Sequence, residues 1–458
     1  MRELRRFLQA SAAVMAVACC MSCGAEAEKS LAVSAGEARM WGSETEHFVM
    51  TGQALCPSGA EASLWFHTSG DGDGYEVRFH DSPIDGSLQT GSLVGVRNLY
   101  RSLAGGSEWF DFEVAVRQKN ISVKVNGTEV VCYTEPDEPW RDDAHQRQRL
   151  GSGRFCFEGR QGRVSFRNLT LKQLGADDRN PSDTLPPVDE KNDSIIRLQQ
   201  RFFPVIDYHV HLKGGLTKEQ AHAMSMNYGI NYGVAPNLGE GGVGRMLADD
   251  DEALAYYEEV KPMAFLMGAQ GEGRRWTVQF SSEAISLFDY IFTDAMTVVD
   301  HGRICRIYHP EEVLLEGRTR QEYMDMIVDQ TVKILTYEPA DIYANATYIP
   351  DDWMADYDRL WTDERVDQVL DVLQRYGIAM EISPRYKIPS FDIIRKAKAR
   401  GLKFTFGTNN VDADFGRLEY AIEAIRACGL TAGDIWFPSM SRRTERKAVD
   451  YNHFAAKE

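Results

Sequence analysis

The chain has 458 residues, of which 43% are hydrophobic, 26% charged and 10% aromatic, and this composition is typical of a folded globular protein and excludes wholesale disorder. The length exceeds a single ordinary core, so two or three domains are expected. The formal net charge of −17 argues against nucleic-acid binding, because phosphate backbones are held by clustered Lys and Arg.

Residues 1–23 have the three parts of an export signal: a basic start, an apolar run and small residues before Cys19. The apolar run is about a dozen residues long, which is too short for a finished transmembrane helix. The sequence Ala-Val-Ala-Cys that ends at Cys19 resembles a bacterial lipobox, although Cys20 or Cys23 is an alternative site. We therefore expect an exported lipoprotein, periplasmic or at the cell surface, held on the outer or cytoplasmic membrane by lipid; a plain secretory signal is the alternative.

Five cysteines follow this segment, and none forms a CxxC pair typical of zinc or redox sites. An odd number leaves at least one free thiol. Several of them lie in apolar strand contexts, so we expect buried structural residues, with one disulfide among them left open. These cysteines are Cys56, Cys132, Cys156, Cys305 and Cys428.

Residues 31–174 alternate short apolar runs with clusters of Gly, Asp, Ser and Asn and show almost no helical periodicity. This pattern predicts an antiparallel β-sandwich. Asn126-Gly127 is a signal for a type I′ hairpin turn. The clearest expected strands are 62–67, 75–80, 110–117, 121–125 and 163–171.

Residues 175–195 combine prolines with many Asp and Asn and are predicted to be a linker. From 196 to 458 strand-like apolar runs alternate with amphipathic helices, and seven or eight such units favour an α/β barrel of the TIM type. The expected strands are 205–211, 232–235, 263–268, 290–293, 342–346, 378–382, 403–407 and 435–437. The expected helices include 321–335, 365–376, 390–400 and 416–428, and Thr217 with Gln220 forms a capping box before another.

Polar residues collect where the predicted barrel strands end, and this rim carries the chemistry of such barrels. His209 and His211 close the first strand, and alternate side chains of a strand share one face. Both imidazoles can therefore reach one cation, with Glu272 from the loop after the third strand as third ligand. We expect a divalent ion, Zn or Mn; a hydrogen-bonding cluster without metal is the alternative.

Two further carboxylates, Asp294 and Glu381, end the fourth and sixth predicted strands and are candidate general acids or bases. A helix-capping or ion-pair role is the alternative for each. Beside Glu272, Arg274 is a candidate clamp for an anionic or polyhydroxyl substrate, and Trp276 is a candidate stacking surface.

Residues 199–458 resemble the polymerase-and-histidinol-phosphatase (PHP) family of metal-dependent hydrolases, and more distantly the amidohydrolases. The resemblance is carried by His209 and His211 at the start and by Gly407-Thr408-Asn409-Asn410 near the end. The chain departs from the family motif at Asn409, where the family has Asp, and at Val411, where it has His. The resemblance implies a reduced metallohydrolase site in which Asn409 contacts substrate; a barrel that binds ligand without metal is the alternative.

Residues 33–174 resemble the 3-keto-disaccharide hydrolase domain, a concanavalin-like jelly roll, and the matching stretches follow in order along 67–77, 90–93, 108–114, 125–127 and 162–169. The resemblance implies a sugar-binding face that carries His67, Glu76, Trp109, Asp111 and Glu158. It also implies that Glu76 and Asp111 flank the bond if the domain cleaves a glycosidic link.

Taken together, these patterns predict an exported carbohydrate-active hydrolase that acts on a disaccharide, its 3-keto form or another glycoside, with metal-assisted chemistry in the barrel. The alternative is a surface glycan-binding protein whose barrel has lost its catalytic site.

Overall fold

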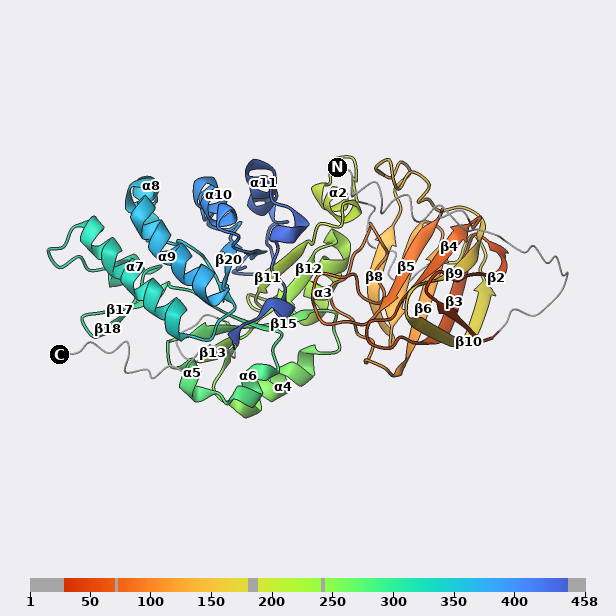
Figure 1. The fold of residues 1–458 in the computed structure, drawn as a ribbon, viewed down its shortest axis with the longest axis horizontal. Coiled ribbons are helices and arrows are strands. Elements are labelled where there is room, and N and C mark those ends of the chain that lie inside the picture. The colour runs from red at the N-terminus through yellow and green to blue at the C-terminus, as the bar shows by residue number, and fades with distance from the viewer. Residues whose placement is uncertain (1–28, 71–72, 180–187, 240–243, 444–458) are drawn as a thin grey trace.

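The computed structural model describes residues 29–70, 73–179, 188–239 and 244–443, and its two bodies lie side by side along the long axis (Figure 1). The predicted signal at 1–23, with Cys19, lies outside the described residues, as does part of the predicted linker. Within the described ranges no helix is both long and apolar enough to cross a membrane.

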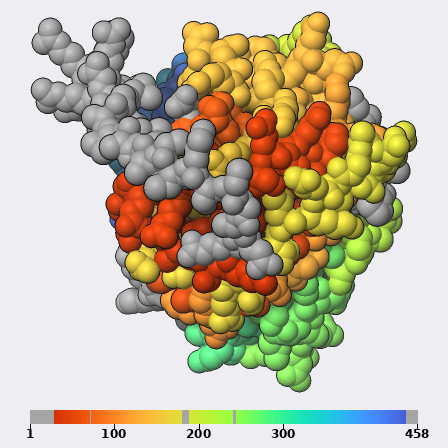
Figure 2. Space-filling model, turned by 90° about the vertical axis from the view of Figure 1, so that its right-hand side faces the viewer, coloured from red at the N-terminus to blue at the C-terminus, as the bar shows by residue number. Residues whose placement is uncertain are grey.

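The first body is a sandwich of two antiparallel sheets, as the sequence predicts. The six-stranded sheet has the order β1-β10-β3-β6-β7-β8, and the four-stranded sheet has the order β2-β9-β4-β5. In Figure 2 the red segments that contain β1 and β3 lie beside the yellow β10, with which both pair. The strands are β1 (Leu31–Ser34), β2 (Ala38–Thr45), β3 (Phe48–Leu55), β4 (Glu61–Thr68), β5 (Tyr75–His80), β6 (Trp109–Arg117), β7 (Asn120–Val125), β8 (Thr128–Thr134), β9 (Gly153–Gln161) and β10 (Arg163–Gln173).

Alternation along the strands produces the sandwich core. On β4, Leu64 and Phe66 are fully buried between the sheets, and Trp65 between them is only partly buried on the other face. The predicted hairpin turn is confirmed, because Asn126 and Gly127 both have positive φ, at 49° and 81°, and join β7 to β8.

The second body is a closed barrel of seven parallel strands in the ring order β11, β12, β15, β16, β19, β20, β21, with β21 paired back to β11. Two short strands, β13 and β14, extend the sheet beside β15. The strands are β11 (Ile206–Val210), β12 (Asn231–Val234), β13 (Asn237–Gly239), β14 (Met246–Leu247), β15 (Leu266–Glu272), β16 (Tyr290–Thr293), β19 (Ile342–Tyr343), β20 (Ala379–Ile382) and β21 (Phe404–Phe406). A separate hairpin consists of β17 (Thr297–Asp300) and β18 (Arg303–Arg306).

Three strand predictions differ from the structure. The strand expected at 342–346 is formed only over Ile342–Tyr343. The strand expected at 435–437 is not formed, because Ile435 makes a single bridge to Phe404 and a 3-10 turn follows. The third barrel strand begins later than expected, because the amide of Met263 donates to Val260 O (2.9 Å) and closes the preceding helix into a turn.

Helices surround the barrel (Figure 1). The predicted capping box is confirmed: Thr217 accepts from the amide of Gln220, and the Gln220 side chain accepts from the amide of Thr217. The helices are α2 (Ser194–Gln200), α3 (Lys218–Tyr228), α4 (Asp250–Val260), α5 (Trp276–Gln279), α6 (Ser282–Ser286), α7 (Arg320–Tyr337), α8 (Tyr357–Leu360), α9 (Asp363–Tyr376), α10 (Phe391–Ala399) and α11 (Glu419–Cys428).

A buried polar junction joins the two bodies. Asn98 of the sandwich donates from Nδ2 to Gln199 O (2.9 Å), and its own amide donates to Gln199 Oε1 (2.8 Å). Asn231 of the barrel donates from Nδ2 to Asn98 O (2.8 Å). Arg97 donates from Nε to Met226 O (2.9 Å), so the sandwich is bound to backbone and side-chain groups of the barrel.

All five cysteines in the described residues are free thiols, and four of them are buried. The disulfide that the sequence left open is therefore not formed there, whereas the expected burial is found.

Candidate functional sites

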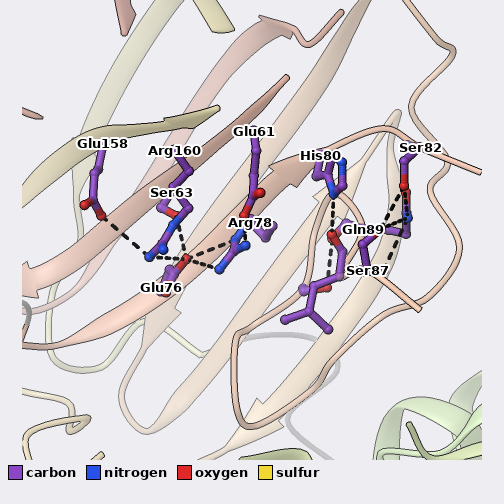
Figure 3. A network of polar contacts seen from close by, with 12 residues as sticks. Glu61, Ser63, Glu76, Arg78, His80, Ser82, Ser87, Gln89, Glu158 and Arg160 are labelled. Carbon is purple, nitrogen blue, oxygen red and sulfur yellow. Dashed lines mark hydrogen bonds and ion pairs between the residues drawn. The ribbon is translucent and has the colours of Figure 1, made fainter. Parts of the chain in front are cut away.

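The first candidate site lies on the outer face of the four-stranded sheet (Figure 3). Strand register brings its side chains together, because Trp65 pairs with Glu76 and Ser63 pairs with both Arg78 and Glu158. The intervening residues, such as Leu64, Val77 and Phe157, point into the sandwich core. The outward positions of three neighbouring strands thus form one polar surface.

Glu76 is the centre of this surface, and only one of its two oxygens is bound. Its Oε1 accepts from Ser63 Oγ (2.5 Å) and from Arg78 Nη2 (2.7 Å), and it is paired with Arg160 Nη2 (3.1 Å). Its Oε2 accepts no hydrogen bond from the described residues. Burial raises the pKa of Glu76, and the positive charge of Arg160 partly opposes this shift.

A cavity of about 330 Å³ opens above Glu76. This volume is within the range of small-molecule sites. Trp65, Arg78 and Arg160 line it from the sheet, the loop 143–148 lines another side, and Phe202 lines it from the segment after α2. The indole of Trp65 is fixed by a bond from Nε1 to Glu158 Oε2 (2.9 Å). The arrangement offers an aromatic surface, two guanidinium groups and a carboxylate to one small polar ligand.

Of the residues predicted for a sugar-binding face, the structure brings Glu76 and Glu158 together here. His67 lies elsewhere: its ring is buried and its Nε2 is bonded to Glu46 O (2.9 Å), and burial lowers its pKa to about 4. Trp109 lies on the other sheet beneath the guanidinium of Arg167, 4.0 Å from the ring centroid.

The predicted pairing of Glu76 with Asp111 is corrected by the structure. Asp111 is exposed on β6 of the six-stranded sheet, where it accepts from Gln53 Nε2 (2.9 Å). Its neighbours Phe110 and Phe112 point into the core that also receives Val77, so Glu76 and Asp111 face away from each other across the sandwich. The two carboxylates cannot flank one bond.

Sequence reasoning missed Trp65, Arg78 and Arg160 as members of this site. The signal was present in the alternation, because each is separated from the next outward position by a core residue. Which polar positions become neighbours depends on strand register, and register is absent from the sequence pattern.

The second candidate site is at the barrel rim, where β11 ends. The Nε2 atoms of His209 and His211 lie 3.1 Å apart, as the shared-face argument predicts. His209 Nδ1 is 2.8 Å from Glu381 Oε2, and His211 Nδ1 is 2.8 Å from Ala235 O. Burial lowers the pKa of both imidazoles, that of His209 to about 3.

These residues fit a metal site only in part, because the two imidazoles meet and the predicted third ligand is bound elsewhere. Outer partners on Nδ1, a carboxylate and a carbonyl, are those of metal-bound imidazoles. Glu272, however, is held by Gln270, which donates from Nε2 to Glu272 Oε1 (2.8 Å) and to Asp294 Oδ2 (3.2 Å). In the part of the chain that the structure describes, no three His, Cys, Asp or Glu side chains surround one point. Catalytic zinc usually takes three protein ligands, so the metal and its three predicted ligands remain a prediction.

A cavity of about 160 Å³ lies at this rim and is lined by Lys213, Glu272, Asp294, Arg385 and Asn409, among others. Burial raises the pKa of Asp294 and raises that of Glu272 to about 8, with the charge of Asp294 contributing. Burial also lowers the pKa of Lys213 to about 8. Asn409 and Asp294 thus face a small polar cavity, as expected for residues at the strand ends.

Three other rim predictions are corrected. Arg274 and Trp276 are 2% and 0% exposed, and both are bound to Glu338: Arg274 by an ion pair (2.8 Å) and Trp276 through Nε1 (3.0 Å). Neither lines the cavity, so they cannot clamp or stack on a ligand there. Glu381 is also buried and is bound to His209 and to the amide of Asn345 (2.8 Å), so it supports the imidazole rather than facing the cavity.

A family model matches the first body. Residues 26–172 match the model of the 3-keto-alpha-glucoside-1,2-lyase-like domain, which covers the sandwich. No curated protein matches the chain. The resemblance of the barrel to PHP hydrolases stays a prediction.

Solved structures that match part of this chain include two candidate glycosyl hydrolases from Parabacteroides distasonis. They are 14% and 16% identical, each covers 32% of this chain, and the matches span 81% and 88% of their own chains with TM-scores of 0.29 and 0.27. A carbohydrate-binding module from Bacillus subtilis is 9% identical over 30% of this chain and 81% of its own, with a TM-score of 0.23. Similarity at this level carries no argument about activity.

Proposed function

We propose that this chain is a carbohydrate-active enzyme that cleaves 3-keto-α-glucosides in the cavity above Glu76. The matched family is named for a 1,2-lyase activity on this class of substrate. The observation that carries the proposal is the half-bound carboxylate: three side chains hold Glu76 Oε1, no described residue donates to Oε2, and Glu76 lines a cavity of suitable size.

The chemistry of such a substrate needs a base of this kind. A carbonyl at C3 acidifies the hydrogen on C2, and Glu76 Oε2 takes that proton as general base. The released electron pair forms the C1=C2 bond as the C1–O bond breaks, and the leaving oxygen takes up a proton. The products are an unsaturated keto sugar and a free alcohol, and later addition of water to the double bond gives overall hydrolysis.

The neighbouring cations suit this step. Arg78 and Arg160 orient the carboxylate and place positive charge where the C3 oxygen becomes an enolate. Arg160 is about one-third exposed, so its charge is accessible from the cavity. Trp65 offers a flat apolar surface to the C–H face of a pyranose ring.

The test is Glu76→Gln, which keeps the shape of the side chain and removes the base. Turnover of methyl 3-keto-α-glucopyranoside, followed by the ultraviolet absorbance of the conjugated product, is expected to fall by about 10²–10⁴-fold, the usual contribution of a general base. Asp111→Asn, a carboxylate change on the opposite face, is the matched control and should retain full activity. Undiminished turnover in Glu76→Gln would refute the proposal, and wild-type binding without turnover would support the alternative of a glycan-binding protein.

We propose further that the chain is exported and lipidated at Cys19, on the strength of the signal-like pattern at 1–23. Mass spectrometry of the mature N-terminus tests this directly. A mature protein that begins with an acylated Cys19 supports the proposal, and one that retains residues 1–18 contradicts it.

A second candidate function is metal-assisted hydrolysis at the barrel rim, favoured by the imidazole pair and its outer partners. His209 and His211 would hold a divalent ion, which would supply an activated water when bound. Metal analysis of the protein purified without chelator, with His209→Ala/His211→Ala as control, tests it. Equal metal content in both proteins would eliminate this candidate.

A further inference from the structure

Phe202, just after α2, combines two unfavourable features. Its backbone has φ = 54°, in the left-handed region that residues with a side chain rarely adopt. Its side chain is also 47% exposed, which is unusual for a phenylalanine. Neither feature stabilises the fold, so the combination calls for a functional explanation.

The local backbone shows why a glycine would be expected here. The amide of Phe203 donates to Leu198 O (2.9 Å), and the amide of Phe202 donates to Gln199 O (3.0 Å). These two bonds define a Schellman motif that ends α2, with Phe202 at the left-handed position that glycine usually occupies. The chain therefore carries an aromatic ring where the turn itself favours no side chain.

The ring lies at the cavity above Glu76. Phe202 lines that cavity together with Trp65, although the two belong to different bodies of the molecule. Its ring contacts His145 of the loop 143–148 at a centroid distance of 6.3 Å. The residue before this loop is fixed to α2, because the amide of Asp142 donates to Gln200 Oε1 (2.8 Å).

We propose that Phe202 is a sugar-contacting residue of this site, so that the segment leading into the barrel supplies one wall of the sandwich's own cavity. The ligand is a pyranoside, whose apolar C–H face packs on the ring while Glu76 and the two arginines bind its oxygens. The inference rests on the proposed function and adds a determinant of substrate affinity. The complete site therefore needs both the sandwich and the segment that leads into the barrel.

The experiment compares Phe202→Gly with the wild-type full-length chain. Glycine relieves the strained turn, so the melting temperature should stay equal or rise. The affinity for methyl 3-keto-α-glucopyranoside should fall about tenfold, measured by calorimetry with Glu76→Gln present in every protein compared, so that the ligand is not cleaved. Phe202→Tyr keeps the ring and should bind within about threefold of wild type, whereas Phe202→Leu should lose affinity as glycine does. Leu254→Ala, an equally exposed apolar residue on α4, is the control and should bind normally.

The outcomes separate the two proposals. Unchanged affinity in Phe202→Gly overturns the assignment of Phe202 and leaves the function of Glu76 intact. Loss of affinity in both Phe202→Tyr and Phe202→Gly with a lowered melting temperature shows a structural role and also overturns it. If the wild-type chain binds no 3-keto-glucoside, the proposed function fails and this assignment fails with it.

Discussion

Glu76 shows how a single side chain acquires reactivity from its surroundings. Strand alternation predicts that it points away from the core, and its register partners on β4 and β9 decide which of its oxygens is bound. The sequence resemblance selected Glu76 and paired it with Asp111, and the structure replaces that partner with Arg78 and Arg160. A carboxylate beside two cations on one face is suited to proton abstraction next to a carbonyl.

The pH dependence of turnover follows from the burial of Glu76. Its pKa is raised above the ordinary 4.5, and the base must be ionised to act. We expect kcat/KM to fall as pH decreases through that raised pKa and to be constant above it, until another group titrates. A pH profile of kcat/KM measured on wild-type protein checks this decrease at low pH. A profile that remains flat to below pH 4.5 would show that Glu76 is not the base.

At the scale of elements, β15 and its following turn carry a buried ionic cluster that supports the barrel. Glu338, at the end of α7, binds Arg274, the Trp276 indole and Thr293 Oγ1 (2.8 Å). These contacts join α5, α7 and β16. The sequence pattern identified Arg274 and Trp276 as polar and aromatic groups near a rim, and it could not show that both turn inward toward a distant carboxylate.

Removing Arg274 should therefore destabilise the protein strongly. Arg274→Ala leaves Glu338 buried without its ion-pair partner, and such losses cost about 3–5 kcal/mol. Urea unfolding measures the change. The exposed neighbour Arg275 is the matched control, and Arg275→Ala should stay within about 0.5 kcal/mol of wild type. Equal stability of the two variants would contradict the structural role of Arg274.

At the scale of the whole molecule, the junction makes the two bodies one unit. Asn98, Gln199 and Asn231 satisfy one another's buried polar groups across it, and no apolar substitute could do so. This rigid connection also places Phe202 at the sandwich cavity. The predicted linker suggested two independent domains, whereas these hydrogen bonds connect the two bodies.

The substitution Asn231→Ala tests the coupling. It removes the amide that donates to Asn98 O and the oxygen that accepts from the amide of Tyr100 (3.2 Å), leaving buried groups unsatisfied at about 1–3 kcal/mol each. Calorimetry should show the melting temperature fall and the unfolding transition separate into two. Asn192→Ala, an exposed asparagine before α2, should unfold like wild type. A single, unshifted transition in Asn231→Ala would indicate that the junction does not couple the bodies.

Much of the architecture could be predicted from the sequence, because alternation and helical periodicity report burial directly. The sandwich, the hairpin at Asn126 and seven barrel strands follow from these patterns, as does the meeting of His209 with His211. Less of the two candidate sites could be predicted from the sequence. Neither the Gln270 amide that holds Glu272 nor the left-handed turn at Phe202 leaves a trace in a pattern of apolar and polar residues.

The closure of the barrel affects the order in which parts of the chain fold. The first strand, β11, pairs with the last, β21, and Asp207 accepts from the amide (3.0 Å) and hydroxyl (2.6 Å) of Thr408, 201 positions later. Because contacts between distant residues form slowly, β11 is expected to present a free edge while the ribosome synthesises the segments between. The pairing of β11 with β21, next to His209, is then formed last, after the sandwich has had time to fold.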